Sequence, residues 1–129
     1  METNNGIEAF YAKTRMQWRK WLAKNCESKK SVCLIISRKN SKTKSIAYVE
    51  SIEEALCFGW IDSKANKRDP ESFYLQFTPR KSSSNWSKPN IERVEKMIKE
   101  GLMTEHGQKS IDLAKKTGRW QPRAKRSSL

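Results

Sequence analysis

Hydrophobic positions early in the chain follow the period of a helix. Within residues 7–24, Trp18, Trp21 and Leu22 fall on one helical face, and Thr14 stands in a capping position before them. The pattern predicts a helix over 7–24. Two tryptophans spaced three residues apart on such a face are typical of core anchors, and we expect them to pack inside rather than to hold a ligand.

The next two elements are predicted to be a strand and a helix. Residues 31–38 enclose an apolar run of Val, Cys, Leu, Ile and Ile, which favours a strand covered on both faces. Ser51 is expected to begin a helix, with Glu54 at the third position of a capping box. Gly59 can close that helix in a left-handed conformation, and the polar connection between the two elements carries no further signal.

Two segments then alternate with the period of strands and flank a turn at residues 69–71. Pairing 61–68 with 73–78 as a hairpin places Phe73, Leu75 and Phe77 toward the core. We expect the opposite face of this hairpin to be polar and to offer a binding surface. Its predicted members are Asp62, Lys64, Asn66, Arg68, Tyr74, Gln76 and Thr78.

The last third of the chain predicts a loop and two helices. Pro79 ends the second hairpin strand, and 80–88 is a serine-rich basic loop. A helix follows Pro89, with Ile91, Val94 and Ile98 as its buried stripe and Gly101 as its stop. Thr104 is expected to cap a final helix that carries Ile111 and Ala114 and ends at Gly118.

These elements predict an α+β fold. The expected architecture is a small, mostly antiparallel sheet of about three strands with a helix inserted between them, an N-terminal helix and two C-terminal helices. A chain of 129 residues is one domain by length. We assign that domain to residues 1–120, and 121–129, which have charge and no apolar pattern, to a disordered basic tail.

The charge balance is strongly basic, and it selects for acidic partners. Lys and Arg total 27 against 14 Asp and Glu, a formal net charge of +13. Such a surface attracts nucleic acid, acidic lipid and phosphorylated metabolites alike. The alternative is a solvated basic surface that serves solubility only, so charge alone does not favour nucleic acid over other anions.

The cysteine pattern excludes two common structural devices. Cys26, Cys33 and Cys57 are odd in number and share no C-x-x-C spacing with one another or with His106, the single histidine. Neither a disulfide framework nor a zinc site is expected, and no cofactor motif is present. Reduced thiols favour a cytoplasmic location. The longest apolar run, 32–36, is too short to span a bilayer, and no export signal opens the chain.

Several ordered signatures resemble the YdeI/OmpD-associated family of small bacterial proteins. They are Phe10-Tyr11-Ala12-Lys13, Trp18-Arg19-Lys20-Trp21-Leu22, Glu53-Glu54-Ala55-Leu56-Cys57-Phe58-Gly59-Trp60-Ile61-Asp62-Ser63, Phe77-Thr78-Pro79-Arg80-Lys81, Asn85-Trp86-Ser87-Lys88, Gly101-Leu102-Met103-Thr104 and Gly118-Arg119-Trp120. The resemblance implies a binding or stress-protection module whose chemistry the family does not define. Longer relatives carry a further helical segment that includes the region named for bacteriocin protection, and activity housed there is expected to be absent or supplied by another chain.

The candidate binding residues gather on the predicted hairpin face and in the loop that follows it. Hydroxyls, amides and a guanidinium in residues 78–87 can converge on a phosphate or carboxylate, and the next helix adds the positive end of its dipole. The alternative is that Ser84 and Ser87 only cap that helix while Arg80 and Lys81 stay solvated. The full candidate set is Trp60, Asp62, Lys64, Arg68, Gln76, Thr78, Arg80, Lys81, Ser84, Asn85 and Trp86.

Function divides into two main hypotheses. The first is a binding or stress-protection module that recognises an anionic small molecule or a protein through the hairpin face and the serine-rich loop. The second is a nucleic-acid-binding protein in which Trp60, Tyr74 or Trp86 stacks on bases. An enzyme acting on a small anionic metabolite is less favoured, because Asp62 among basic neighbours is typical of an ion-pair partner and no base–nucleophile pair is present.

Overall fold

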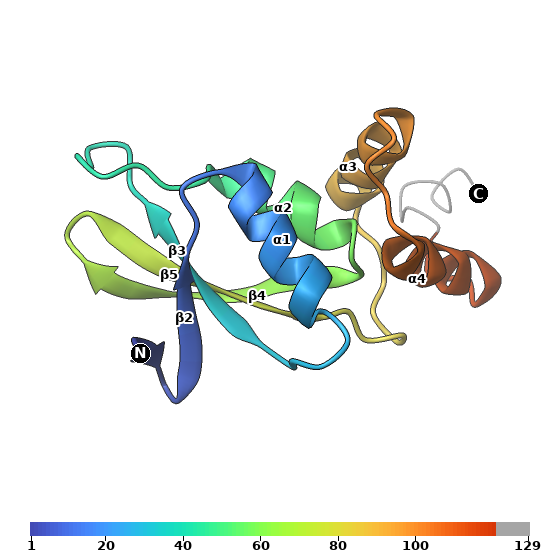
Figure 1. Ribbon diagram of the computed structural model, residues 1–129. Coiled ribbons are helices and arrows are strands. Elements are labelled where there is room, and N and C mark those ends of the chain that lie inside the picture. Colours follow the sequence, from blue (N-terminus) through green and yellow to red (C-terminus); the bar gives the residue numbers. More distant parts are fainter. Residues whose placement is uncertain (121–129) are drawn as a thin grey trace, which may run out of the picture.

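The computed structural model describes residues 1–120, and the predicted tail 121–129 lies outside the described residues. The fold is α+β (Figure 1). Its elements are β1 (Thr3–Asn4), β2 (Ile7–Tyr11), α1 (Arg15–Asn25), β3 (Val32–Ser37), α2 (Tyr48–Leu56), β4 (Trp60–Asp69), β5 (Ser72–Pro79), α3 (Lys88–Lys99) and α4 (Glu105–Lys116). No helix in this part of the chain is long and apolar enough to cross a membrane.

The sheet corrects the predicted architecture. Within residues 1–120 it has five strands in the order β1-β2-β3-β5-β4, and β2 runs parallel to β3 while the other neighbours are antiparallel. The expected three-stranded, mostly antiparallel sheet is therefore wrong. Residues 7–11 form a strand instead of the start of a helix, and Thr14 caps α1 by accepting a hydrogen bond from the Gln17 N–H at 3.2 Å.

A tight turn joins the two N-terminal strands that the prediction lacked. Asn5 and Gly6 both have positive φ, 53° and 80°, as a two-residue hairpin turn with the twist of its strands requires. Glycine adopts this conformation without steric penalty, and asparagine tolerates it better than most residues. The turn folds residues 1–4 back along β2, where the Ala9 N–H donates to the Glu2 carbonyl at 2.9 Å.

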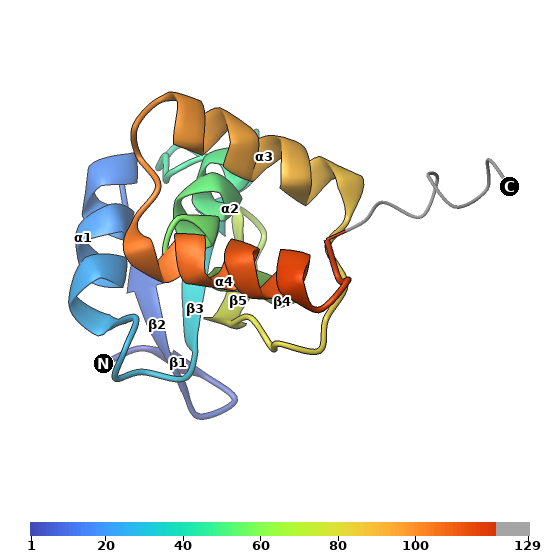
Figure 2. The ribbon, with the colours of Figure 1, turned by 90° about the vertical axis from the view of Figure 1, so that its right-hand side faces the viewer.

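One face of the sheet packs against the helices and forms the main core. Figures 1 and 2 show α1 and α2 against this face, with α3 and α4 at the end where β4 begins. Trp18 is fully buried and Trp21 is 8% exposed, so their predicted role as core anchors is confirmed. The Trp18 and Phe77 rings lie 5.1 Å apart, and the Trp18 indole N–H donates to the Ser51 carbonyl at 3.0 Å. Aromatic packing thus joins α1 to the sheet and to α2.

Two helix predictions need correction. Ser51 lies inside α2, which begins at Tyr48, because the Glu50 carboxylate accepts the Ala47 N–H at 3.2 Å and caps the helix earlier. In α3 the buried stripe is Ile91, Val94 and Met97, while Ile98 is 44% exposed. Met97 faces α1, where its sulfur lies 3.9 Å from the Arg15 guanidinium, and Ile98 lies near the end of α3 with its side chain partly in solvent.

Two buried glutamates tie three helices together. Glu53 and Glu54 of α2 are 4% and 2% exposed. Glu54 accepts from Arg15 Nε and from Arg19 Nη1, both at 2.8 Å, and these donors lie on α1. Glu53 accepts from Arg15 Nη2 and from Lys96 Nζ of α3, both at 2.9 Å. Each buried carboxylate has two cationic partners, which is the condition for tolerating such groups inside a protein.

A bulge in β4 changes which residues share the polar hairpin face. Asp62 pairs with Phe77 and Ile61 with Thr78, and the register then shifts before Ala65. Direct cross-strand partners lie on the same face, so Asp62 falls on the side of Phe77. The predicted polar face placed Asp62 with Thr78, and this assignment is wrong because strict alternation cannot pass through a bulge.

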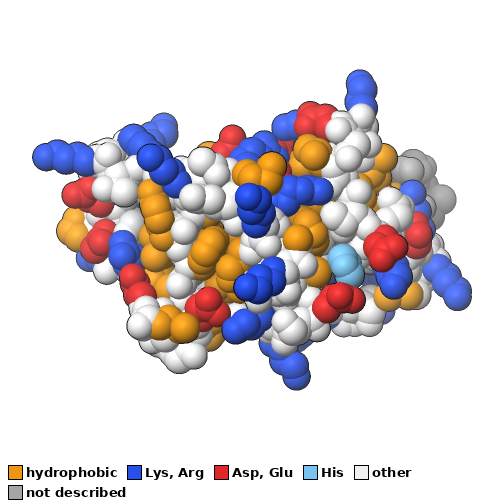
Figure 3. Space-filling model, viewed as in Figure 1, with side chains coloured by type: hydrophobic (Ala, Val, Ile, Leu, Met, Phe, Trp, Pro, Cys, Tyr) orange, Lys and Arg blue, Asp and Glu red, His pale blue; other side chains and the backbone are white. Residues whose placement is uncertain are grey.

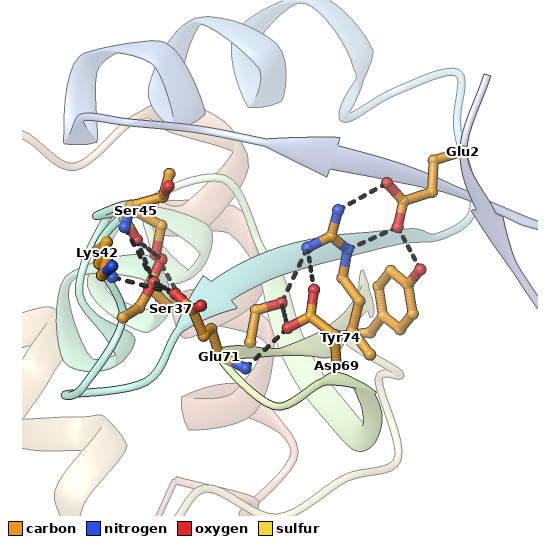
Figure 4. Close-up of polar contacts among 11 residues, drawn as sticks. Glu2, Ser37, Lys42, Ser45, Asp69, Glu71 and Tyr74 are labelled. Atoms are coloured by element: carbon orange, nitrogen blue, oxygen red, sulfur yellow. Dashed lines mark hydrogen bonds and ion pairs between the residues drawn. The ribbon is translucent and has the colours of Figure 1, made fainter.

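The face away from the helices is covered in part by the N-terminal residues. A small apolar cluster lies there, formed by Ile7, Ala9, Cys33, Ile35 and Tyr74. The Asn4 amide lies 3.7 Å from Cys33 Sγ. Glu2 accepts two hydrogen bonds from the Arg68 guanidinium, at 2.7 and 3.0 Å, and a third from the Tyr74 hydroxyl (Figure 4). Arg68 is therefore already paired within the chain.

Acid is expected to release this N-terminal contact. The Arg68 guanidinium, followed by the Tyr74 hydroxyl, lowers the pKa of Glu2 from its ordinary value of 4.5 to about 2. The unfolded chain then binds more protons between these two values, so the contribution is complete above about pH 5 and is lost as pH falls through 2. Because Glu2 is partly exposed, we expect about 1 kcal/mol or less.

Urea unfolding at several pH values measures this contribution. Glu2→Gln should lower stability at pH 7 and should match the unsubstituted protein near pH 2. Glu8→Gln serves as the control, because it also removes a carboxylate that has a cationic partner, Lys29 at 3.4 Å. A difference between Glu2→Gln and the unsubstituted protein that stays constant across this pH range would contradict the assignment.

Candidate anion-binding pocket

The serine-rich loop after β5 and helix α4 enclose a pocket of about 290 Å³. β5 delivers the loop at Pro79, and the Ser87 hydroxyl ends it by capping α3. Polar or charged lining groups come from both walls: Arg80, Lys81, Ser82 and Ser84 from the loop, and His106, Lys109 and Ser110 from α4. Segments far apart in sequence therefore form one pocket.

Arg80 is held in place by its own loop. Its guanidinium donates to the Ser84 hydroxyl at 2.9 Å and to the Asn85 carbonyl at 3.2 Å, and it lies 4.1 Å from the centre of the Trp86 ring. The Arg80 backbone N–H also donates to the Gly59 carbonyl at 2.8 Å. A cation over an indole face in this geometry is stabilised by the ring, so the guanidinium is positioned before any ligand arrives.

The pocket has a positive potential with no counter-charge in its lining. Arg80, Lys81 and Lys109 line it, and within residues 1–120 no Asp or Glu does. Burial lowers the pKa of Arg80, because desolvation disfavours its charged form. In the same part of the chain no carboxylate lies within ion-pair distance of these three residues, as the described pairs all lie elsewhere. An anion would supply the missing charge.

Trp60 and Trp86, the two tryptophans named from the sequence, both line this pocket. Trp60 and Trp86 are 1% and 4% exposed. The Trp60 indole N–H donates to the Cys26 carbonyl at 3.2 Å, and the Trp86 ring packs 5.1 Å from that of Trp120. Rings buried to this extent have no free face on which a base could stack, so they shape the pocket instead of acting as a stacking platform.

The remaining sequence candidates lie outside the pocket lining. Lys64, Arg68, Gln76 and Thr78 are on the β4–β5 hairpin, as is Asp62. Gln76 Oε1 is buried without a hydrogen-bond partner in the described structure. The Asn85 side chain accepts from Arg119 at 3.4 Å and braces the loop from outside. The structure thus brings together Trp60, Arg80, Lys81, Ser84 and Trp86, and separates them from the hairpin face.

The sequence analysis did not identify the side of the pocket that α4 forms. His106 lines the pocket with 30% of its side chain exposed, and its Nδ1 lies 4.0 Å from Glu27 Oε2. A usable signal was present, because residues 106, 109, 110 and 113 recur at the spacing of one helical face. Because that face is partly polar, the pattern does not indicate a buried helical face.

Close packing of α4 on the end of α2 brings this wall into place. Gly59 has φ of +77° and closes α2 as predicted, and a Cβ there would lie 3.2 Å from the His106 carbonyl oxygen. The Thr104 N–H and hydroxyl both donate to the Cys57 carbonyl, the first at 3.2 Å. Burial raises the pKa of the Cys57 thiol to about 11, which makes it an inert core group.

A family model matches most of the chain. The model of a domain of unknown function, DUF8412, matches residues 10–110, which include β3, both hairpin strands, the serine-rich loop and the first part of α4, up to Ser110. No curated protein and no solved structure matches the chain.

Proposed function

The chain belongs to the DUF8412 family, and we propose from its own geometry that it binds a small anion between the serine-rich loop and α4. The observation that carries the proposal is a pre-positioned guanidinium in a basic pocket whose described lining contains no acid. A phosphate or carboxylate would receive charge-assisted hydrogen bonds from Arg80 and from the lysines on either wall.

The size of the pocket limits the ligand. A volume of about 290 Å³ lies at the lower end of the range for small-molecule sites, roughly 300–1,000 Å³. It suits inorganic phosphate, a phosphate ester or a small polycarboxylate. Serine hydroxyls at positions 82 and 110 can donate further hydrogen bonds to such an anion, whereas the Ser84 hydroxyl already donates to the Lys81 carbonyl at 2.9 Å. A nucleic acid strand would contact the rim of this pocket only.

The lining favours binding over catalysis. Cys26 is the thiol in the lining, and burial, followed by the nearby Glu27 charge, raises its pKa, which disfavours the reactive thiolate. The charged partner of His106 is Glu27, which does not line the pocket. In the described structure no nucleophile is hydrogen-bonded to His106. We therefore assign recognition of an anion and no reaction.

A role in stress protection and membership of the YdeI/OmpD-associated family stay predictions from the sequence signatures. A cytoplasmic location is supported by the three cysteines, which are all free. The earlier nucleic-acid hypothesis loses its stacking residues, because Trp60 and Trp86 are buried and Tyr74 is 9% exposed with its hydroxyl on Glu2.

Removing the two exposed lysines of the pocket is expected to weaken anion binding about ten-fold. Lys81→Gln with Lys109→Gln deletes one cation from each wall, while Arg80, which also braces the loop, is left unchanged. Thermal unfolding should be measured with inorganic phosphate, pyrophosphate and citrate at 150 mM chloride. A ligand at a hundred times its Kd stabilises the folded state by about 2.7 kcal/mol.

The matched control keeps the net charge of the variant but leaves the pocket intact. Lys99→Gln with Lys116→Gln removes two exposed lysines from α3 and α4 that do not line the pocket. This pair should retain the full response to the anion. If both double variants lose the response equally, general charge explains the binding and the pocket assignment is wrong. If none of the three anions stabilises the unsubstituted protein, the proposal also fails.

A further inference from the structure

A second groove runs between α1 and β2, and its described lining shares no residue with the anion pocket. It has a volume of about 670 Å³, and we call it the α1–β2 groove. Its lining residues fall into three chemical groups. Phe10, Tyr11 and Trp21 are aromatic, Lys13, Lys20, Lys24 and Lys29 are basic, and Gln17 and Asn25 carry amides.

The charge of the groove is positive over most of its length. Glu8 is the one acidic lining residue, and it pairs with Lys29 at 3.4 Å. No carboxylate of residues 1–120 lies within ion-pair distance of Lys13, Lys20 or Lys24. Lys20 and Lys24 lie four residues apart on α1, so they point to the same side of the helix about 6 Å apart along its axis.

Of the three aromatic groups in the groove, Trp21 is buried and Phe10 is partly buried, whereas Tyr11 is exposed. Tyr11 is 40% exposed, and its hydroxyl donates to the Lys44 carbonyl at 2.5 Å, which fixes the ring at the surface. Phe10 is partly buried, and its ring lies 6.0 Å from that of Trp21. Figure 3, viewed as Figure 1, shows Lys and Arg side chains around hydrophobic ones near the middle of this face. The Tyr11 ring thus lies at the edge of the groove, on the side of its β3 partner Ile35, and lysines of α1 line the same groove.

We propose that the α1–β2 groove binds a segment of single-stranded nucleic acid. Unpaired bases can stack on an exposed tyrosine while lysines contact the adjacent phosphates, which is how strands are held without sequence preference. A duplex keeps its bases inside and offers phosphates only. An acidic membrane or an acidic peptide would contact the lysines, but it would not require an aromatic ring at position 11. The combination of a fixed, exposed ring and unpaired lysines therefore favours a single strand.

Fluorescence anisotropy with labelled oligo(dT) and oligo(U) 12-mers tests the proposal on the full chain. Lys13→Gln, Lys20→Gln and Lys24→Gln together should weaken binding at least ten-fold and should reduce the slope of log K against log salt by about 2, at roughly 0.7 for each phosphate contact. Tyr11→Leu should weaken binding about ten-fold with little change in slope, because stacking is not an ionic contact. Circular dichroism melting confirms that each variant is folded.

The control variant removes three exposed lysines elsewhere, Lys42→Gln, Lys99→Gln and Lys116→Gln, and should leave binding within about two-fold. Equal losses of affinity in both triple variants would overturn the assignment of binding to the groove and would leave net charge as the cause.

Equal affinity for a duplex of the same length, or an unchanged affinity in Tyr11→Leu, would overturn the single-strand assignment. Binding to vesicles of acidic lipid without binding to either oligonucleotide would identify a membrane surface instead. Lys81→Gln with Lys109→Gln should not change oligonucleotide binding, which separates this site from the anion pocket.

Discussion

Glu54→Ala is expected to lower the free energy of unfolding by about 3–5 kcal/mol. The Glu54 carboxylate is buried and accepts hydrogen bonds from Arg15 and Arg19, both at 2.8 Å. Truncation leaves Arg19 without its carboxylate partner and Arg15 with Glu53 as its remaining close one, and both guanidinium groups then face a cavity. A typical domain has only about 5–15 kcal/mol in total, so this single change would remove a large share of the stability.

Urea denaturation at pH 7 measures the loss directly. Glu95→Ala is the control, because Glu95 is an exposed glutamate on α3 with no ion pair in the described structure. It should change stability by about 0.5 kcal/mol or less. A loss in Glu54→Ala no larger than that of the control would mean that the network contributes little, and that packing of Trp18 and its neighbours holds α1 and α2 together without it.

The sequence pattern located these glutamates but not their environment. Glu53 and Glu54 follow Ser51 in a segment correctly expected to be helical, and charged residues there are usually solvated. Their partners on α1 lie 35–39 positions earlier in the chain and Lys96 lies 43 positions later. No local period reports contacts over such separations. Buried ion pairs therefore stay invisible until the helices are placed.

The sheet was only partly predictable for a related reason. The long hairpin and β3 have clear alternation or apolar runs, and their positions were found. β2 has five residues of mixed character and β1 has two, too few for a period to appear. Once β2 is recognised, the parallel pairing follows, because α1 provides the crossover that joins β2 to β3.

The candidate site likewise has one part that depends on local sequence and one part that depends on contacts between distant segments. Loop chemistry at Arg80, Lys81 and Ser84 could be predicted, because turn-forming and hydrogen-bonding residues cluster there. The opposite wall could not, since it depends on how closely α4 approaches α2. The prediction of a polar hairpin face failed at the β4 bulge, because one extra residue there reverses which side chains face the core.

Gly107→Ala is expected to cost about 3 kcal/mol, although alanine is the better helix former by about 1 kcal/mol. A Cβ at Gly107 would lie 2.5 Å from the Cys57 carbonyl oxygen and 2.6 Å from that of Leu56. Both are backbone atoms at the end of α2, so α4 itself must move. That movement breaks the hydrogen bonds from Thr104 to the Cys57 carbonyl. Propensity and packing therefore predict opposite signs, and the contact distances favour packing.

Gly101→Ala separates this clash from backbone strain. Gly101 has φ of +75° and open space around it, so its substitution should cost only about 1 kcal/mol of strain. Because α4 carries His106, Lys109 and Ser110 into the pocket, Gly107→Ala should also weaken phosphate or citrate stabilisation, whereas Gly101→Ala should not. A Gly107→Ala protein more stable than the unsubstituted chain would show that α4 does not pack this closely on α2. The pocket wall would then have to be placed differently, because the same glycine contact holds both the helix and the charges it presents.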